Sequence, residues 1–289
     1  MTADPNDPTT PPWDYRTMLP GDASAYDTGV IEGGLTVEEQ AWLSQQRHAW
    51  ESQFTGGYRS PEELVSGHSI AIVPSRWVKF EQWLPFATDT SAPISLSRGE
   101  VADVARRCRE SGLWLPLLVT SFAWGWGSRG FGPTRLLWVL EGKGGSAGLS
   151  TSEIEKRLAA AVDALDQQGA RGAYGLMLDA GRLSEFGPAF FTKFLYFASR
   201  TDNARGRALI LDARLALQMR AFWQRRADEP YAATSRSARW LWTGPRWSDY
   251  RYQIYRTFVC RSAAQLSKSG ERWTPELVEL LLFRATRTA

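Results

Sequence analysis

The sequence predicts a mostly α-helical protein with little sheet, and three observations support this fold class. Apolar residues recur at helical spacing in several segments, and a Ser or Thr followed three residues later by Glu opens three of them. Gly112, Gly169, Pro188 and Pro275 fall where helices are expected to end or begin. Apolar residues make up 43% of the 289 residues, which is enough for a sizeable core in one large domain or two small ones.

The first half of the chain divides into a tail and a helical region. Residues 1–34 are rich in Pro, Asp, Thr and Gly, so we expect a disordered N-terminal tail. Residues 35–150 are expected to form an N-terminal helical region with a loop rich in Gly and Trp. Two capping boxes open helices in it: Thr36 with Glu39, and Ser97 with Glu100. The second helix should end at Gly112, and the run Ile70 to Val73 predicts a short strand.

Residues 151–289 are expected to form a second helical region that carries the chemistry. Ser152 and Glu155 predict a third capping box, and Gly169 should close the helix that follows. Pro188 suits the first position of the next helix, because an N–H there has no helical partner. Three later helices carry these apolar stripes: Leu215, Met219, Phe222 and Trp223; Tyr252, Tyr255 and Val259; and Leu277, Leu280 and Leu281 after Thr274–Pro275.

Cysteine and histidine usage excludes several classes of site. The two cysteines, Cys108 and Cys260, are too few for a four-cysteine zinc or iron–sulfur centre. His48 and His68 lie 20 residues apart without an HExxH context, so a histidine-based catalytic centre is not expected. We therefore expect no metal cluster and no cofactor.

Targeting signals are also not expected. The longest apolar run, 113–126, is too short to span a bilayer and contains Pro116 and Gly125. The N-terminus is acidic and rich in proline, which is unlike a signal peptide. The sequence therefore predicts a cytoplasmic protein that does not enter the membrane.

Charge is distributed unevenly along the chain. The net charge is only +3, but residues 1–100 hold 6 Lys and Arg against 14 Asp and Glu, a balance of −8. Residues 200–272 hold 15 Lys and Arg against 6 Asp and Glu, a balance of +9. This polarity indicates a basic face for a polyanion, although a solvated Arg-rich surface explains it equally well.

A single lysine stands in a strongly apolar helix. Between Glu185 and Arg200 the one charged residue is Lys193. Apolar and aromatic side chains surround it on nearly every face: Phe190, Phe191, Phe194, Leu195, Tyr196 and Phe197. Burying an unpaired ammonium is costly, and burial favours the neutral amine, which is the nucleophilic form. The alternative is that the side-chain stem packs inside while the ammonium extends to solvent.

An aspartate follows 19 residues later, at the start of a helix. Asp212 ends the short apolar run that begins at Ala208, and an amphipathic helix follows it. Aspartate is a favoured N-cap, which is sufficient by itself to explain its position. A carboxylate at a helix N-terminus also stays ionised, so it can stabilise positive charge nearby.

Two further segments have the composition of nucleic-acid contacts. Residues 122–133 include a G-x-G-x-x-G string, but Gly132–Pro133 follow where a dinucleotide site needs a helix. We interpret this segment as a glycine-rich loop with two indoles and Arg129, or as a tight turn with packed tryptophans. Residues 236–256 alternate arginines with aromatics, which suits phosphates and bases but also an aromatic core with an arginine rim.

Lys193 and Asp212 together resemble the helix-hairpin-helix DNA glycosylases. In that superfamily a lysine in the second helix of a hairpin precedes an aspartate at a helix start. The string Phe-Phe-Thr-Lys-Phe-Leu-Tyr-Phe-Ala is similar to the lysine helix of archaeal 8-oxoguanine glycosylases and of bacterial proteins with an OGG fold. The resemblance covers residues 175–223. It departs from the common Leu-Pro-Gly-Val-Gly-x-Lys hairpin, because Lys193 lies six residues after Gly187.

The resemblance implies a fold of helical domains flanking a DNA-binding cleft. It implies double-stranded DNA with a modified base as the partner, base flipping, attack of Lys193 on the sugar C1′, and stabilisation of positive charge by Asp212. AP-lyase cleavage can follow. The substrate is 8-oxoguanine or a phage hypermodified base, the latter in antiviral defence. The implied contacts are Gly187, Thr192, Arg200, Arg129 and Arg246 for DNA, and Trp124, Trp126, Phe190 and Phe191 for the base pocket.

Two alternatives belong to other functional classes. One is a non-catalytic DNA-binding or protein-interaction module, in which Lys193 reaches solvent and Asp212 only caps a helix. The other is an α/β phosphoryl-transfer enzyme, suggested by the apolar runs that end at Asp179 and Asp212. The second ranks lower, because the chain has no phosphate loop and no regular β–α alternation.

Overall fold

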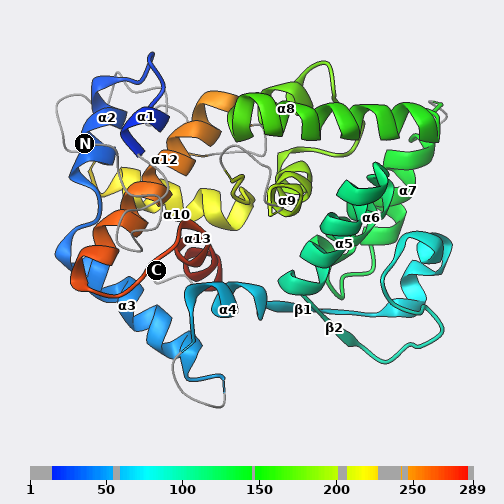
Figure 1. Ribbon diagram of the computed structural model, residues 1–289, viewed down its shortest axis with the longest axis horizontal. Coiled ribbons are helices and arrows are strands. Elements are labelled where there is room, and N and C mark those ends of the chain that lie inside the picture. Colours follow the sequence, from blue (N-terminus) through cyan, green and yellow to red (C-terminus); the bar gives the residue numbers. More distant parts are fainter. Residues whose placement is uncertain are drawn as a thin grey trace. The chain divides into compact units, whose positions relative to one another are not determined.

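The structure is a computed structural model, and most of the chain that it describes is helical (Figure 1). The described residues are 15–54, 59–144, 147–200, 207–226, 242 and 247–285. Within these ranges the only sheet consists of β1 (Ser69–Ile72) and β2 (Ile94–Ser97). The prediction of a mostly α protein with little sheet is therefore confirmed.

The chain separates into two compact units. Unit 1 combines residues 1–65 with 213–289, and unit 2 is the uninterrupted segment 66–212. Unit 1 thus joins both ends of the chain, and unit 2 contains both Lys193 and Asp212. The sequence-based division at 34 and 150 follows composition and motif position rather than contacts, and it stays a prediction.

In unit 2, the apolar lysine helix is the central element. The helices of this unit are η1 (Pro74–Trp83), α5 (Arg98–Ser111), α6 (Leu115–Trp126), α7 (Gly132–Glu141), α8 (Thr151–Leu178) and α9 (Pro188–Ala198). Helix α9 packs against α5, α6 and α8, which explains why nearly all of its faces are apolar. β1 pairs antiparallel with β2, with Ser69 opposite Ser97, so the predicted strand is confirmed.

Helix starts follow the capping rules, with one difference from the prediction. The box of Ser97 and Glu100 is present at α5, and that helix ends at Gly112. At α8 the cap is Ser150, whose side chain accepts from the Glu153 N–H, so the predicted box of residues 152 and 155 is wrong. The string Ser150-Thr-Ser-Glu-Ile-Glu contains two overlapping Ser-x-x-Glu patterns, and the earlier one caps the helix.

Two glycines shape unit 2. Gly169 has φ 75° and interrupts α8 where we expected the helix to end, but the helix resumes and continues to residue 178. Gly125 and its flanking tryptophans belong to α6, so the predicted glycine-rich loop shrinks to residues 127–131. Apolar periodicity extends α6 further than the glycines suggested, because Gly125 is tolerated where another helix approaches closely.

Among the described residues, unit 1 contains α1 (Tyr15–Met18), α2 (Ala25–Gly33), α3 (Val37–Glu51), α4 (Pro61–Ser66, whose last residue belongs to unit 2), α10 (Ala213–Gln224), α12 (Asp249–Leu266), η2 (Ser267–Ser269) and α13 (Pro275–Arg284). The capping box of Thr36 and Glu39 is present at α3, and the Thr274 side chain caps α13. These predicted helix starts are confirmed.

The expectation of a disordered tail is wrong for residues 15–34, while residues 1–14 lie outside the described residues. Asp27 of α2 is fully buried and accepts from Trp223 Nε1 at 2.9 Å and from the Tyr250 hydroxyl at 2.7 Å. Burial and the hydrogen bond to Asp27 raise the pKa of Tyr250 to about 12. Partners near the other end of the chain therefore order a segment whose local composition favours disorder.

Within the described ranges, no helix is long and apolar enough to cross a membrane. The same ranges hold no group of three or more His, Cys, Asp and Glu side chains with the geometry to bind a metal ion.

Candidate active site

Helix α9 carries Lys193 into the interior of unit 2. The helix begins at Pro188 after Gly187, and residues 179–187 connect it to α8. The Lys193 residue is only 6% exposed, and every residue from Phe191 to Ala198 is buried. The predicted burial of this helix is therefore confirmed.

The Lys193 ammonium group is held inside the unit rather than directed to solvent. Its Nζ donates to the Ala189 carbonyl oxygen at 2.7 Å and lies 3.4 Å from Asp212 Oδ2. It also lies 5.8 Å from the centroid of the Phe190 ring, within the range of a cation–π contact. The alternative in which this lysine extends to solvent does not match these contacts.

Asp212 reaches Lys193 because the segment before it runs against α9. The Thr192 hydroxyl accepts from the Leu211 N–H at 3.1 Å, and residues 208–211 are buried. The Asp212 side chain is 16% exposed, so one side of the pair remains accessible to solvent. Two residues that are 19 positions apart in the sequence thus form one partly buried ion pair, as the spacing suggested.

Gly125 of α6 makes room for the lysine side chain. A Cβ atom at this position would lie 2.8 Å from Lys193 Cδ and 3.2 Å from its Cε. Carbon atoms do not approach so closely without displacement, so the glycine allows α6 and α9 to pack with Lys193 between them. The sequence marked Gly125 only as a member of a glycine-rich string.

Aromatic rings beside Lys193 form a parallel stack. Phe190 stacks on Phe122 with ring centroids 4.4 Å apart and planes 18° apart, and on Trp126 at 5.5 Å and 21°. Phe190 and Trp126 are half-buried, so part of this stack is accessible. Of these two predicted base-pocket residues, Phe190 lies beside the ammonium group and Trp126 stacks on Phe190.

The other two predicted base-pocket residues lie in the core. Trp124 is 3% exposed and contacts the rings of His68 and Phe197. Phe191 is 1% exposed and packs edge-on against Tyr174. Both belong to the faces of α6 and α9 that pack against other elements, because a helix turns 100° between successive residues. Neither side chain is placed to contact a base in this conformation.

The predicted DNA contacts occupy different environments. Arg129 is exposed in the loop between α6 and α7, Gly187 is half-buried before α9, and the Arg200 guanidinium lies 5.7 Å from the Tyr196 ring centroid. Thr192 is fully buried with its hydroxyl bonded to backbone, so it does not reach a phosphate here. Arg246, and most of the segment 236–256 before Trp247, lie outside the described residues.

Sequence reasoning missed a charged cluster at the α8–α9 connection. Glu185 has a positive φ of 60°, and its carboxylate lies 3.3 Å from Lys143 Nζ and 3.7 Å from an Arg135 nitrogen. The Arg135 Nε also donates to the Glu185 carbonyl oxygen at 3.1 Å. The sequence offered only the glutamate two residues before Gly187, because its partners, Arg135 of α7 and Lys143 just after α7, precede it by 50 and 42 residues.

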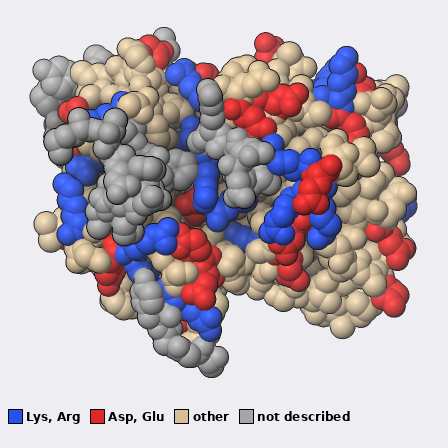
Figure 2. All heavy atoms as spheres, in the orientation of Figure 1, with Lys and Arg blue, Asp and Glu red and all other residues tan. Residues whose placement is uncertain are grey.

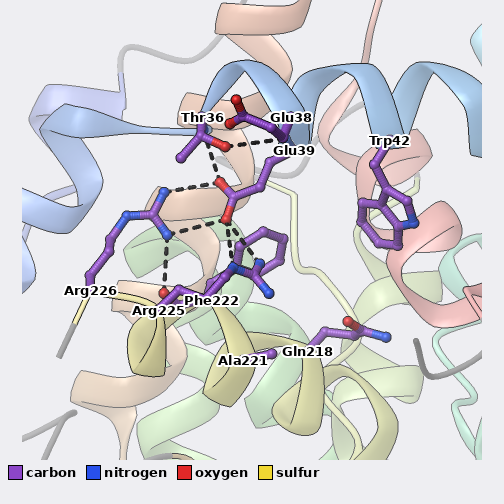
Figure 3. Close-up of a pocket in the computed structure, with 9 residues that line it drawn as sticks. All are labelled: Thr36, Glu38, Glu39, Trp42, Gln218, Ala221, Phe222, Arg225 and Arg226. Carbon is purple, nitrogen blue, oxygen red and sulfur yellow. Dashed lines mark hydrogen bonds and ion pairs between the residues drawn. The ribbon is translucent and has the colours of Figure 1, made fainter. Parts of the chain in front are cut away.

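Unit 1 has a separate pocket of about 530 Å³ between α3 and α10 (Figure 3). Its lining includes no predicted catalytic residue: Thr36, Glu38, Glu39, Trp42, Gln218, Ala221, Phe222, Arg225 and Arg226. The buried Glu39 carboxylate binds Arg225 at 2.9 Å and Arg226 at 3.0 Å, and it also accepts from the Thr36 N–H. These ion pairs join the start of α3 to the end of α10.

The excess of basic residues in 200–272 does not lie wholly on the surface. Figure 2 shows basic and acidic side chains interspersed over the face that it displays. Some arginines of 200–272 are largely withdrawn from the surface: Arg226 is mostly buried and paired with Glu39, and Arg251 and Arg256 are buried. The prediction of a single basic face for this region remains a prediction.

The α/β phosphoryl-transfer alternative is wrong. The run that ends at Asp179 is the last turn of α8, and the run 208–211 is neither helix nor strand. That alternative requires both runs to be strands, and short apolar runs fit buried helices and buried strands equally well.

Comparison with known families gives one match. A family model described as "Putative 8-oxoguanine DNA glycosylase OGG-like protein" matches residues 63–283, which include Lys193 and Asp212. The comparisons with curated proteins and with solved structures gave no match.

Proposed function

Because the chain belongs to the OGG-like family, we propose that it excises a modified base from double-stranded DNA, with Lys193 as nucleophile and Asp212 as its carboxylate partner. The observation that carries this proposal is the contact of Lys193 Nζ with Asp212 Oδ2 at 3.4 Å inside unit 2. An amine nucleophile and a carboxylate within reach of one reacting carbon are the two groups that this chemistry needs.

The proposed reaction begins with a nucleotide flipped out of the duplex, because a stacked base cannot be reached. The Lys193 ammonium first gives one proton to the Asp212 carboxylate with which it is paired. The neutral amine then attacks C1′ and the N-glycosidic bond breaks, so that the base leaves with the bonding electron pair and with one proton from the amine. Opening of the sugar ring, with protonation of O4′ by the Asp212 carboxyl, leaves Lys193 joined to C1′ as a protonated Schiff base. β-Elimination from this adduct would give AP-lyase activity.

Asp212 and the aromatic stack serve this reaction in different ways. The Asp212 carboxylate stabilises the positive charge that develops on the sugar and accepts or relays the amine proton. The half-buried stack of Trp126 on Phe190 adjoins the nucleophile through Phe190, and an aromatic surface of this kind suits a planar base. Thus the position of the rings favours a flipped base as the ligand, and 8-oxoguanine is the first base to test because of the family.

Borohydride trapping tests the nucleophile directly. The protein is incubated with duplexes that carry an intact modified base, 8-oxoguanine first, and any imine is reduced to a stable protein–DNA adduct. Lys193→Gln should abolish both the adduct and base release, because glutamine retains the length and helix propensity of lysine but is not nucleophilic. Duplex binding should remain measurable. Trapping that survives Lys193→Gln would place the nucleophile elsewhere.

Asp212→Asn tests the carboxylate. Asparagine also favours helix starts, so the fold and DNA binding should be retained. Base release should fall by about 10²–10³-fold, the cost of removing one such electrostatic group. Wild-type turnover in this variant would remove Asp212 from the mechanism. Excision without an adduct, yet dependent on Asp212, would indicate a water nucleophile and a monofunctional glycosylase.

The alternative of a non-catalytic DNA-binding module predicts a different set of results. In that case no duplex would yield a released base, and Lys193→Gln would change neither trapping nor binding. Binding to unmodified and modified duplexes would also be equal. The same panel of duplexes therefore separates the two functions.

A further inference from the structure

Helix α9 and the serine at its C-cap present two buried hydroxyl groups to the segment that leads to Asp212. Thr192 Oγ1 accepts from the Leu211 N–H, and Ser199 Oγ accepts from the Ala208 N–H, each at 3.1 Å. Both residues are buried, with Thr192 0% and Ser199 1% exposed. Thr192, which comes first along the chain, binds Leu211, and Ser199 binds Ala208. Residues 208–211 therefore run antiparallel to α9.

The spacing of the two contacts matches the geometry of the two partners. Seven residues of helix rise about 10.5 Å. Three steps of extended chain span about 10 Å. A segment anchored at Ala208 and Leu211 therefore has no slack between its two contacts, and its last anchored residue directly precedes Asp212. A shift by one residue would break both hydrogen bonds at once.

The Thr192 hydroxyl is itself fixed by its own helix. It donates to the Pro188 carbonyl oxygen at 2.7 Å, with the Leu211 carbonyl oxygen at 3.2 Å as a second acceptor. Ser199 Oγ likewise donates to the Tyr196 carbonyl oxygen at 2.8 Å. Each hydroxyl is oriented by its donor bond and therefore offers its lone pair in a fixed direction to the segment.

We propose that Thr192 is a positioning residue for the reaction, whose hydroxyl fixes Leu211 and thereby sets the place of Asp212 relative to Lys193. The effect of Thr192 on the reaction rests on the proposed function. Its role in holding Leu211 does not. Thr192 and Lys193 are consecutive residues of one helix, so one helical turn carries both the nucleophile and the group that places its partner. Ser199 anchors the far end of the same segment.

Amide hydrogen exchange tests the structural part without any substrate. Thr192→Val keeps the side-chain volume but removes the acceptor, so the Leu211 amide should exchange about five- to tenfold faster, as expected for one lost hydrogen bond. Thr192→Ser should restore slow exchange. Ser121→Ala is the matched control, because that buried hydroxyl donates only within its own helix, to Leu118 O. Unchanged exchange at Leu211 in Thr192→Val would overturn the proposal.

Trapping on an 8-oxoguanine duplex at saturating concentration tests the catalytic part. Thr192→Val should slow adduct formation by tenfold or more, on the order of the misplacement penalties seen in active sites, with duplex affinity unchanged. In an Asp212→Asn background the same substitution should cause no additional loss, because it acts through that carboxylate. An equal loss in both backgrounds would overturn the assignment of Thr192 to Asp212.

The two readouts separate the failure of this proposal from the failure of the proposed function. If the wild-type protein forms no adduct with any duplex, the proposed glycosylase function is wrong. The exchange rate of the Leu211 amide then still decides whether Thr192 holds residues 208–211. If Thr192→Val does not fold, Ser199→Ala releases the same segment from its far end. It should then speed exchange at Ala208 and slow trapping, and normal values of both would overturn the proposal.

Discussion

Gly125 illustrates how much of the candidate site depends on a single missing methyl group. Gly125→Ala would place a Cβ 2.8 Å from Lys193 Cδ, so the lysine side chain must move away from its present contacts. We expect borohydride trapping to fall by at least about tenfold, since small misplacements in active sites cost 10- to 100-fold. Stability should change by less than about 1 kcal/mol, because alanine favours the helix and offsets part of the strain.

Gly175→Ala provides the matched control for that substitution. Gly175 lies in α8 of the same unit, and an added Cβ there meets no atom within 4 Å. This variant should be as stable as the wild type or slightly more so, and its trapping should be unchanged. Equal trapping by the two alanine variants would show that Lys193 needs no space at Gly125.

At the residue scale the sequence predicted Lys193 and Asp212 but not the contacts that hold them in place. Lys193 stood out because a charged residue in an apolar helix is costly, and Asp212 because of its place at a helix start. The resemblance implied Thr192 as a DNA contact. Only the structure shows its hydroxyl bonded to the Leu211 N–H. Such long-range partners have no local signature.

At the element scale, the Glu39 ion pairs join α3 and α10. Burial raises the pKa of the Glu39 carboxyl, but hydrogen bonds from Arg226 and the Thr36 N–H, together with the Arg226 charge, outweigh it and hold the pKa below 4.5. A carboxyl whose pKa is lower in the folded than in the unfolded state stabilises the folded protein when the pH is above the unfolded-state pKa. This stabilisation is lost as the pH falls through the folded-state pKa. Glu39→Gln should therefore lower the free energy of unfolding at pH 7 by about 1–3 kcal/mol.

The difference between Glu39→Gln and the wild type should shrink as the pH falls below about 4.5, because the wild-type carboxyl becomes protonated as well. Denaturant titrations at pH 7, 5, 4 and 3 measure it. Glu38→Gln is the control, since Glu38 lies in the same helical turn and hydrogen bonds at the helix start also lower its pKa, but it is exposed and the Arg225 and Arg226 ion pairs belong to Glu39. Its smaller pH dependence should be subtracted from that of Glu39→Gln. A difference that stays constant from pH 7 to pH 3 would contradict the role of the carboxylate charge.

The connection between α8 and α9 supports a prediction about DNA binding. If this connection contacts phosphates, Glu185 competes with them for Lys143 and Arg135. Glu185→Gln should then strengthen binding to an unmodified duplex and steepen its salt dependence by about one counterion. Its effect on stability should stay near or below about 1 kcal/mol, because both ion pairs are partly exposed to solvent.

Asp103→Asn separates a local effect from a change in net charge. Asp103 pairs with Arg106 on the exposed side of α5 in the same unit, and its substitution removes the same charge. Fluorescence anisotropy at several salt concentrations compares the two variants. Equal gains in affinity would assign the effect to net charge and remove the connection from the DNA footprint.

The helices themselves were largely predictable, because their starts carry local signals. The boxes at Thr36 and Ser97 were identified correctly, since both partners lie within four residues. The box at 152 failed where two patterns overlap, and Glu155 instead accepts from the N–H groups of Trp114 and Leu115. Helix α2 was missed because its order depends on residues about 200 positions away.

At the scale of the whole molecule, each unit contains one of the two cysteines. Cys108 lies in α5 of unit 2 and Cys260 in α12 of unit 1, and both are buried free thiols. Burial raises the pKa of Cys108 to about 11 and that of Cys260 to about 12. We expect neither thiol to react with an alkylating reagent at pH 8 in the folded protein, because the thiolate is the reactive form.

Alkylation in increasing denaturant should then report the opening of each unit separately. Mass spectrometry assigns the label, and Cys108→Ala and Cys260→Ala confirm each assignment. Labelling at one cysteine before the other would show that the units open independently, whereas coincident labelling would show one cooperative transition. Rapid labelling of either thiol without denaturant would contradict its burial.

The discontinuity of unit 1 also has a consequence for the order of events during translation. All of unit 2 has been synthesised once residue 212 is added. The hydrogen bonds of Asp27, in contrast, cannot form until Trp223 and Tyr250 have been synthesised, 196 and 223 residues later. Contacts of such high sequence separation form late, and chains fold from the segments that are already complete. A nascent chain should thus bring Lys193 and Asp212 together while its first helices still lack their partners.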